Sequence, residues 1–74
     1  HHEPADPKIV VKAVKAEGFK ILGLPRRKPK HFEVLGLKKG KYSELHVELD
    51  GNIYKDKPVA KNDDKWSEEL RAAG

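Results

Sequence analysis

The segment from Ser43 to Leu49 alternates strictly between polar and apolar residues, and this pattern constrains the fold more than any other feature of the chain. An extended strand places successive side chains on opposite faces, so the alternation predicts a strand with one face toward a core. The inward face carries Leu45, Val47 and Leu49, and the outward face carries Glu44, His46 and Glu48. Just before this segment, Lys39-Gly40 suits a tight hairpin turn, and Phe32 to Leu37 supplies the partner strand. The sequence therefore predicts an antiparallel hairpin at the centre of the fold.

An amphipathic helix is expected before this hairpin. Asp6-Pro7 is typical of a helix start, because the carboxylate accepts amide hydrogens of the first turn and Pro loses no hydrogen bond there. The apolar residues that recur at helical spacing predict one buried face, formed by Ile9, Val10, Ala13 and Val14. Gly18 can end the helix in the left-handed conformation. A first strand should then run from Phe19 to Leu24 and end at Pro25, which cannot donate to a sheet.

The C-terminal part of the chain predicts a short strand, a linker and a last helix. Ile53 and Tyr54 follow a turn signal at Asp50-Gly51-Asn52 and can form a fourth strand. Residues 55–62 are typical of a linker, and Asp63 or Asp64 can cap the helix that follows. One stripe of that helix would carry Trp66, Leu70 and Ala73.

Seventy-four residues allow one small domain, because two would leave neither half enough chain for a core. We expect an α+β fold in which the N-terminal helix packs on a three- to four-stranded antiparallel sheet, with a short C-terminal helix. Residues 6–54 would form the domain, and residues 55–74 a linker and a helix that docks on it. Residues 1–5, which open with two histidines, are interpreted as a tag remnant with a disordered N-terminus. No membrane insertion is expected, since the longest apolar run is Ile9 to Val11.

Leucines occupy the outer face of the first two predicted strands, where a one-sided sheet would carry polar residues. They are Leu22, Leu24, Leu35 and Leu37. Two explanations are open. The terminal helix can fold back and lay Trp66 and Leu70 over them. Alternatively, these leucines together with Trp66 bind another protein or a second copy of this chain.

Positive charge is concentrated in the middle of the chain. Residues 25–41 contain seven basic residues and one acidic residue, a net charge of +6, whereas the whole chain carries +4. The basic residues are Arg26, Arg27, Lys28, Lys30, Lys38, Lys39 and Lys41. Lysines at turns keep a small sheet soluble and discourage edge pairing. The same residues could meet the phosphates of a nucleic acid or another anionic polymer, although they fall in two separate turns without interleaved aromatic residues for stacking.

Few residues can support catalysis. The chain has no Cys, which excludes disulfides, thiolate metal sites and a thiol nucleophile. The outward row of Glu44, His46 and Glu48 could hold a divalent metal, but strand neighbours on one face stand nearly 7 Å apart and only Glu33 is an obvious further donor. A solvated strand face is therefore the preferred interpretation, and His31 is interpreted as a surface residue. We expect no enzyme activity, no cofactor, no metal and no small-molecule substrate.

The stretch from about Asp6 to Ile53 resembles the PepSY family. The segment from Ile9 to Phe19 is similar to the family's helix running into a glycine–aromatic strand start, and Phe32-Glu33-Val34 is similar to its aromatic–Glu–Val strand. Gly40 to Gly51 resembles the hairpin that follows, with its glycine–lysine turn, alternating strand and closing Asp and Gly. The resemblance implies a bacterial module, periplasmic or secreted, that binds proteins and inhibits or modulates a peptidase.

These observations together predict a small exported protein-binding module that is not an enzyme and that binds its partner through the outer leucines, an exposed strand edge or the basic turn. The expected partner is a protein, with a peptidase as the class that the resemblance suggests, and the expected state is a monomer or weak homodimer. Binding of a nucleic acid or anionic polymer through the basic turns is the alternative.

Overall fold

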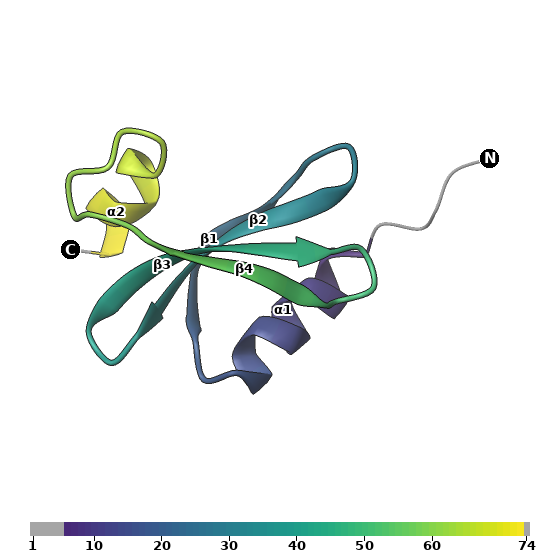
Figure 1. The fold of residues 1–74 in the computed structure, drawn as a ribbon. Coiled ribbons are helices and arrows are strands. Elements are labelled where there is room, and N and C mark those ends of the chain that lie inside the picture. The colour runs from purple at the N-terminus through teal and green to yellow at the C-terminus, as the bar shows by residue number, and fades with distance from the viewer. Residues whose placement is uncertain (1–5, 74) are drawn as a thin grey trace.

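A computed structural model describes residues 6–73 of the chain. The chain forms a helix, four strands and a second helix in that order (Figure 1). The elements are α1 (Pro7–Ala16), β1 (Lys20–Arg27), β2 (His31–Lys38), β3 (Lys41–Glu48), β4 (Ile53–Pro58) and α2 (Ser67–Ala73). The strands form one antiparallel sheet in the order β1-β2-β3-β4, which confirms the α+β fold expected from the sequence. The predicted tag remnant, residues 1–5, lies outside the described residues.

Helix α1 covers one face of the sheet, where it packs against β1 and β2. It starts as predicted: the Asp6 side chain accepts a hydrogen bond of 2.9 Å from the Lys8 amide, and Pro7 occupies the first turn. Gly18 follows the helix with a φ of +92°, which a residue with a side chain rarely adopts. The buried core of this face consists of Val10, Val14, Phe32, Val34, Leu45 and Val47. We call it the α1 face.

The opposite face, which we call the α2 face, is covered by the C-terminal segment. Trp66 and Leu70 pack on Leu22 and Leu35, and all four side chains are buried. The Asp63 carboxylate caps this segment, because its Oδ1 accepts hydrogen bonds from the amides of Lys65 (2.9 Å) and Trp66 (3.2 Å). The two helices therefore lie on opposite faces and toward different ends of the sheet (Figure 1).

Strand β1 continues beyond its predicted end. The prediction that Leu24-Pro25 stops the strand is wrong, because β1 runs on to Arg27. It is an edge strand, so the amide hydrogen that proline lacks is not needed on its outer side. The pairing with β2 shifts between Leu22 and Arg26, and Gly23 has a φ of +75° within this bulge. The bulge breaks the alternation of side chains, and Leu24 is left 82% exposed.

Strand β4 is also longer than predicted. The sequence predicts a strand at Ile53 and Tyr54 followed by a linker, whereas residues 55–58 belong to the sheet. All of these residues are exposed on an edge strand. A register shift between His46 and Val47 accompanies the pairing of β4 with β3. Charged residues are common at such an edge, and a strand composed of them lacks the polar–apolar alternation from which strands are predicted.

Candidate functional site

The α2 face carries a compact group of ionisable side chains beside its leucines. Four residues define it, and we call it the histidine–glutamate cluster: His31, Glu33, Glu44 and His46. Strands β2 and β3 bring them together, because Glu33 pairs with His46 across the ladder, and His31 and Glu44 lie two residues away from them on the same strands. Residues two apart on a strand share a face, so all four side chains project from the same side of the sheet.

The two imidazoles of the cluster stack and face the carboxylates. Their ring centroids are 5.0 Å apart with an angle of 10° between the planes. The Nε2 atom of His31 lies 3.2 Å from Glu33 Oε2, and that of His46 lies 3.9 Å from the same oxygen. His46 Nε2 also lies 2.6 Å from Glu44 Oε2. The ring of Tyr54, from β4, meets both imidazoles edge-on with centroids about 6 Å away.

The segment before α2 closes one side of the cluster. The Trp66 indole donates from Nε1 to Glu44 Oε1 at 2.7 Å. The Lys65 ammonium lies 2.6 Å from Glu33 Oε1 and 3.2 Å from Glu44 Oε1. Both glutamates are buried, with exposed fractions of 6% and 5%, and Arg26 stacks over the Trp66 ring at 4.0 Å. Each carboxylate therefore has one oxygen turned toward Lys65 and the other toward an imidazole.

The partners of the carboxylates keep them ionised despite burial. Burial by itself would raise the pKa of Glu44, but hydrogen bonds from Trp66 and His46 and the Lys65 ammonium outweigh it and lower the pKa to about 2. Burial likewise opposes ionisation of Glu33, yet Lys65 and the neighbouring imidazole lower its pKa below the usual range. For Lys65, burial would lower the pKa and the two carboxylates raise it. The site thus holds two carboxylates and one ammonium at neutral pH.

The cluster differs from the metal trio considered from the sequence. Glu44 and His46 belong to it, but Glu48 is exposed and accepts a hydrogen bond of 2.6 Å from the Asn52 side chain. His31, interpreted from the sequence as a surface residue, is half-buried and paired with Glu33. The tight turn at Lys39-Gly40 fixes which residues of β2 and β3 pair, and counting back along this register places Glu33 opposite His46. No comparable local signal in the sequence indicates that Trp66 and Lys65 contact the carboxylates of this cluster.

The predicted leucine surface is divided between a buried part and an exposed residue. Leu22 and Leu35 are buried beneath Trp66 and Leu70 of the C-terminal segment, Trp66 is itself buried there, and Leu37 is half-buried. Leu24 points away from this cover and lines a groove of about 480 Å³ between α1 and β1. We call it the Leu24 groove. Its lining consists of Pro7, Lys8, Val11, Lys12, Lys15, Leu24 and Pro25, which includes three lysines and no acidic residue.

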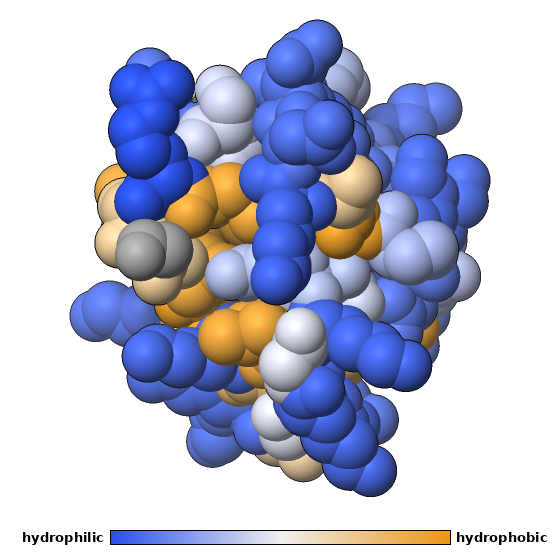
Figure 2. Space-filling model, turned by 90° about the vertical axis from the view of Figure 1, so that its left-hand side faces the viewer, coloured by the Kyte–Doolittle hydropathy of each residue, from blue (hydrophilic) through white to orange (hydrophobic). Residues whose placement is uncertain are grey.

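The predicted basic patch is dispersed. Arg26 is committed to the α2 face, where its guanidinium lies 3.0 Å from Glu69 Oε2, and Arg27 lies over the Phe32 ring. Lys38 donates to the Glu17 carbonyl at 2.7 Å. The other four lie at or beside the two turns that flank β2, at opposite ends of that strand: Lys28, Lys30, Lys39 and Lys41. At the end of the molecule with α2 and the β2–β3 turn, apolar side chains gather on one side of the view and hydrophilic side chains surround them (Figure 2).

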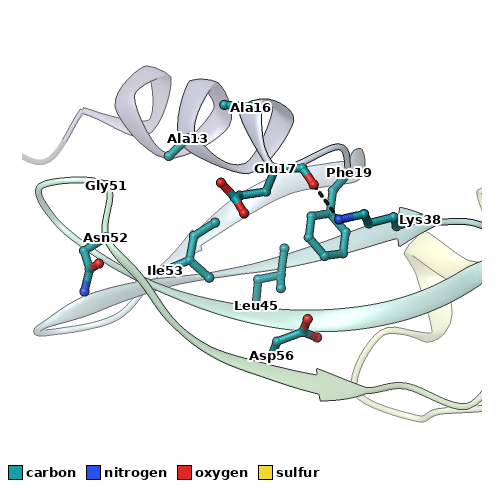
Figure 3. Close-up of a pocket in the computed structure, with 10 residues that line it drawn as sticks. All are labelled: Ala13, Ala16, Glu17, Phe19, Lys38, Leu45, Gly51, Asn52, Ile53 and Asp56. Carbon is teal, nitrogen blue, oxygen red and sulfur yellow. Dashed lines mark hydrogen bonds between the residues drawn. The ribbon is translucent and has the colours of Figure 1, made fainter.

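A second groove, of about 550 Å³, lies between α1 and the β3–β4 half of the sheet (Figure 3). Phe19, Leu45 and Ile53 provide its large apolar side chains. Carboxylates from Glu17 and Asp56 lie on opposite sides of it. Its lining is therefore of mixed charge, in contrast to the uniformly cationic rim of the Leu24 groove.

Comparisons with protein-family models, with curated proteins and with solved structures find no significant match to this chain. Among the described residues, neither helix has the length and apolar character needed to cross a membrane.

Proposed function

We propose that this chain is a protein-binding module without enzymatic activity, and that its Leu24 groove receives an apolar side chain from a protein segment with acidic residues on either side. The observation that carries the proposal is the exposure of Leu24. At 82%, it is the most exposed large apolar residue among the described residues. It lies in a groove whose other apolar members are Val11, Pro7 and Pro25. Exposed apolar side chains grouped in a groove are typical of interaction sites.

The charge around the groove favours an acidic partner. Lys8, Lys12 and Lys15 are all exposed and lie on the side of α1 that borders the groove. Oppositely charged groups across an interface accelerate association and discriminate against wrong partners more than they add affinity. The affinity would come mainly from burial of the Leu24 side chain, which contributes about 1.5–3 kcal/mol when complete. Because Pro25 and the bulge blunt the β1 edge, side-chain docking is favoured here over addition of a strand.

The resemblance to the PepSY family supports a narrower version of the proposal. It suggests that the partner is a peptidase and that the module acts in the periplasm or outside the cell, as a free-standing inhibitor or modulator. Inhibition is compatible with the absence of catalytic groups in the Leu24 groove, since a docked module can obstruct a peptidase without chemistry of its own.

The experiment that tests the proposal is selection of displayed random peptides on the immobilised full chain. We expect enriched peptides to combine an apolar residue with flanking Asp or Glu. A synthetic peptide of the consensus sequence should bind, by fluorescence anisotropy, about tenfold or more weakly to Leu24→Ser than to the unmodified chain. Ile9→Ser is the matched control, because Ile9, on α1, is like Leu24 an exposed aliphatic residue but does not line the groove.

Three results would contradict it. The first is that the enriched peptides lack acidic residues, and the second is that Leu24→Ser and Ile9→Ser weaken binding equally. The third is that a single-stranded oligonucleotide binds more tightly than any selected peptide. If its affinity also falls steeply with salt and is lost in Lys39→Glu, the chain is an anion-binding protein, which is the alternative function.

The narrower peptidase proposal has a separate test. The full chain is titrated into thermolysin while hydrolysis of a quenched fluorescent peptide is followed. We expect the rate to fall with increasing concentration of the unmodified chain and to stay higher with Leu24→Ser. An unchanged rate would remove thermolysin-type peptidases as partners without affecting the peptide-binding result.

A further inference from the structure

We infer that the histidine–glutamate cluster is a binding site for a divalent transition metal, with His31 Nε2, Glu33 Oε2 and His46 Nε2 as its protein ligands. One nitrogen or oxygen from each of these residues lies within 4.8 Å of the other two. Two imidazoles and one carboxylate are the ligands that Zn²⁺ takes in three-ligand sites with a fourth position open. The site lies on the α2 face, away from the Leu24 groove, so the inference does not depend on the proposed function.

The distances require only a small rearrangement for coordination. With bonds of about 2.0–2.2 Å, a tetrahedral ion draws its ligand atoms to about 3.3–3.5 Å from one another. His31 Nε2 is already 3.2 Å from Glu33 Oε2, and His46 Nε2 is 3.9 Å from that oxygen. The main changes are that the two stacked rings turn from their nearly parallel orientation toward a common point beside Glu33, and that each neutral imidazole carries its hydrogen on Nδ1, so that Nε2 binds the ion in place of its contact with a carboxylate. Both imidazoles are half-buried and close to strand β4 at the sheet edge, where an ion can reach them.

The surroundings orient the ligands as partners outside a metal's first shell do. The Lys65 ammonium forms ion pairs with the Oε1 atoms of both carboxylates, and the Trp66 indole also donates a hydrogen bond to Oε1 of Glu44. The Oε2 atoms of Glu33 and Glu44 are thereby directed at the imidazoles. Glu44 Oε2, 2.6 Å from His46 Nε2, is the nearest candidate for a fourth ligand. Because Lys65 and Trp66 contact only the Oε1 atoms, the Oε2 atoms can exchange their contacts with the imidazoles for a bond to a cation.

The donor types select the class of metal. Imidazole nitrogens suit Zn²⁺, Cu²⁺ and Ni²⁺, whereas Mg²⁺ and Ca²⁺ prefer sites composed of oxygen ligands. The charges around the site favour binding of a cation, because two buried carboxylates lie beside one close ammonium, that of Lys65. The second lysine near them, Lys57, is 4.0 Å from Glu44 Oε2 and half exposed. A chain with neutral imidazoles therefore presents an electronegative site on this face.

The test is a titration of Zn²⁺ into the full chain, monitored in one series by isothermal titration calorimetry and in another by ¹⁵N NMR of the imidazole nitrogens. His1 and His2 are metal ligands by their chemistry, so every protein in the experiment carries His1→Ala and His2→Ala. We expect one ion per chain, with large shifts of the Nε2 resonances of His31 and His46, and no comparable effect of Mg²⁺. Substitution of His31→Gln or His46→Gln should weaken binding by a factor of about ten to one hundred or more.

Glu48→Gln is the matched control, because Glu48 lies on the same strand as His46 but outside the ligand set, and it should leave the affinity unchanged. Circular dichroism of each variant shows whether it is folded, and His31, next to a turn, is the ligand whose replacement disturbs the fold least. Absence of binding to the folded parent protein would overturn the inference. So would an affinity that is unchanged in folded His31→Gln, or a loss in Glu48→Gln as large as that in His46→Gln.

Discussion

The two faces of the sheet are built from different kinds of interaction. Among the described residues, the α1 face buries only apolar side chains, whereas the α2 face buries leucines next to two ionised glutamates. An apolar contact tolerates many substitutions of similar volume, but a buried carboxylate needs particular donors in particular places. The α1 face therefore contributes stability that does not depend on particular donors, whereas the α2 face also holds a specific polar arrangement, in which the proposed metal site and the dependence on pH are concentrated.

Trp66 connects the two components of the α2 face. Its ring is fully buried in the cluster that contains Leu35, its Nε1 donates to Glu44, and the Arg26 guanidinium lies over the ring. Arg26 is in turn paired with Glu69 of α2. A single side chain therefore anchors the C-terminal segment and completes the polar cluster, and its removal should affect both.

The largest effect is expected from Trp66→Ala. It removes the biggest fully buried side chain and leaves Glu44 Oε1 without its indole donor, so we expect a loss of about 3–5 kcal/mol in the free energy of unfolding. Urea denaturation followed by circular dichroism measures it. Trp66→Phe is the informative companion, because it keeps most of the apolar contact and loses only the hydrogen bond, at about 1–3 kcal/mol. Equal losses in the two variants would show that the hydrogen bond, and not packing, dominates.

The second effect is the response of the α2 face to acid. The pKa of Glu44 is about 2 in the folded chain against an ordinary value of 4.5, so the folded chain binds fewer protons between these values. The stabilisation is complete above about pH 4.5 and is lost as the pH falls toward 2, on the order of 3 kcal/mol in all. The chain has one Trp, so Trp66 fluorescence during urea denaturation at several pH values reports it directly.

Two variants isolate the carboxylate responsible for this acid response. Glu44→Gln should reduce the dependence of stability on pH below 4.5 and leave the part due to Glu33, whose pKa is also lowered, while Glu48→Gln, at an exposed position, should leave the dependence as in the unmodified chain. A slope that persists unchanged in Glu44→Gln would assign the acid response to other carboxylates.

The smallest of the three effects is expected on the α1 face. Val34→Ala removes two methyl groups from a fully buried position, which should cost about 2 kcal/mol. Because its neighbours in that core do not ionise, the cost should be the same at pH 7 and pH 3. The measurement is urea denaturation at both pH values. A cost that changes by more than about 1 kcal/mol with pH would show that the two faces are coupled through the sheet.

The parts of the fold that were predictable from the sequence are those with local signals. The helix start at Asp6-Pro7 and the hairpin at Lys39-Gly40 depend on residues next to each other, and the structure has positive φ values of +53° and +77° at these two turn residues. The ends of β1 and β4 were not predictable in this way. Their bulges and exposed charged residues arise because both strands lie at the sheet edge, and edge position is a property of the assembled sheet.

The sequence by itself determined which residues can lie on each face of the central hairpin, because the alternation of a strand has a period of two and needs no distant partner. It thereby placed Glu44 and His46 on one side and Leu45 and Val47 on the other. Only the tertiary structure decided that Trp66, 22 positions beyond Glu44, becomes its hydrogen-bond donor. The physical reason is that burial of a carboxylate and docking of the C-terminal segment stabilise each other, and neither is encoded in the residues adjacent to it.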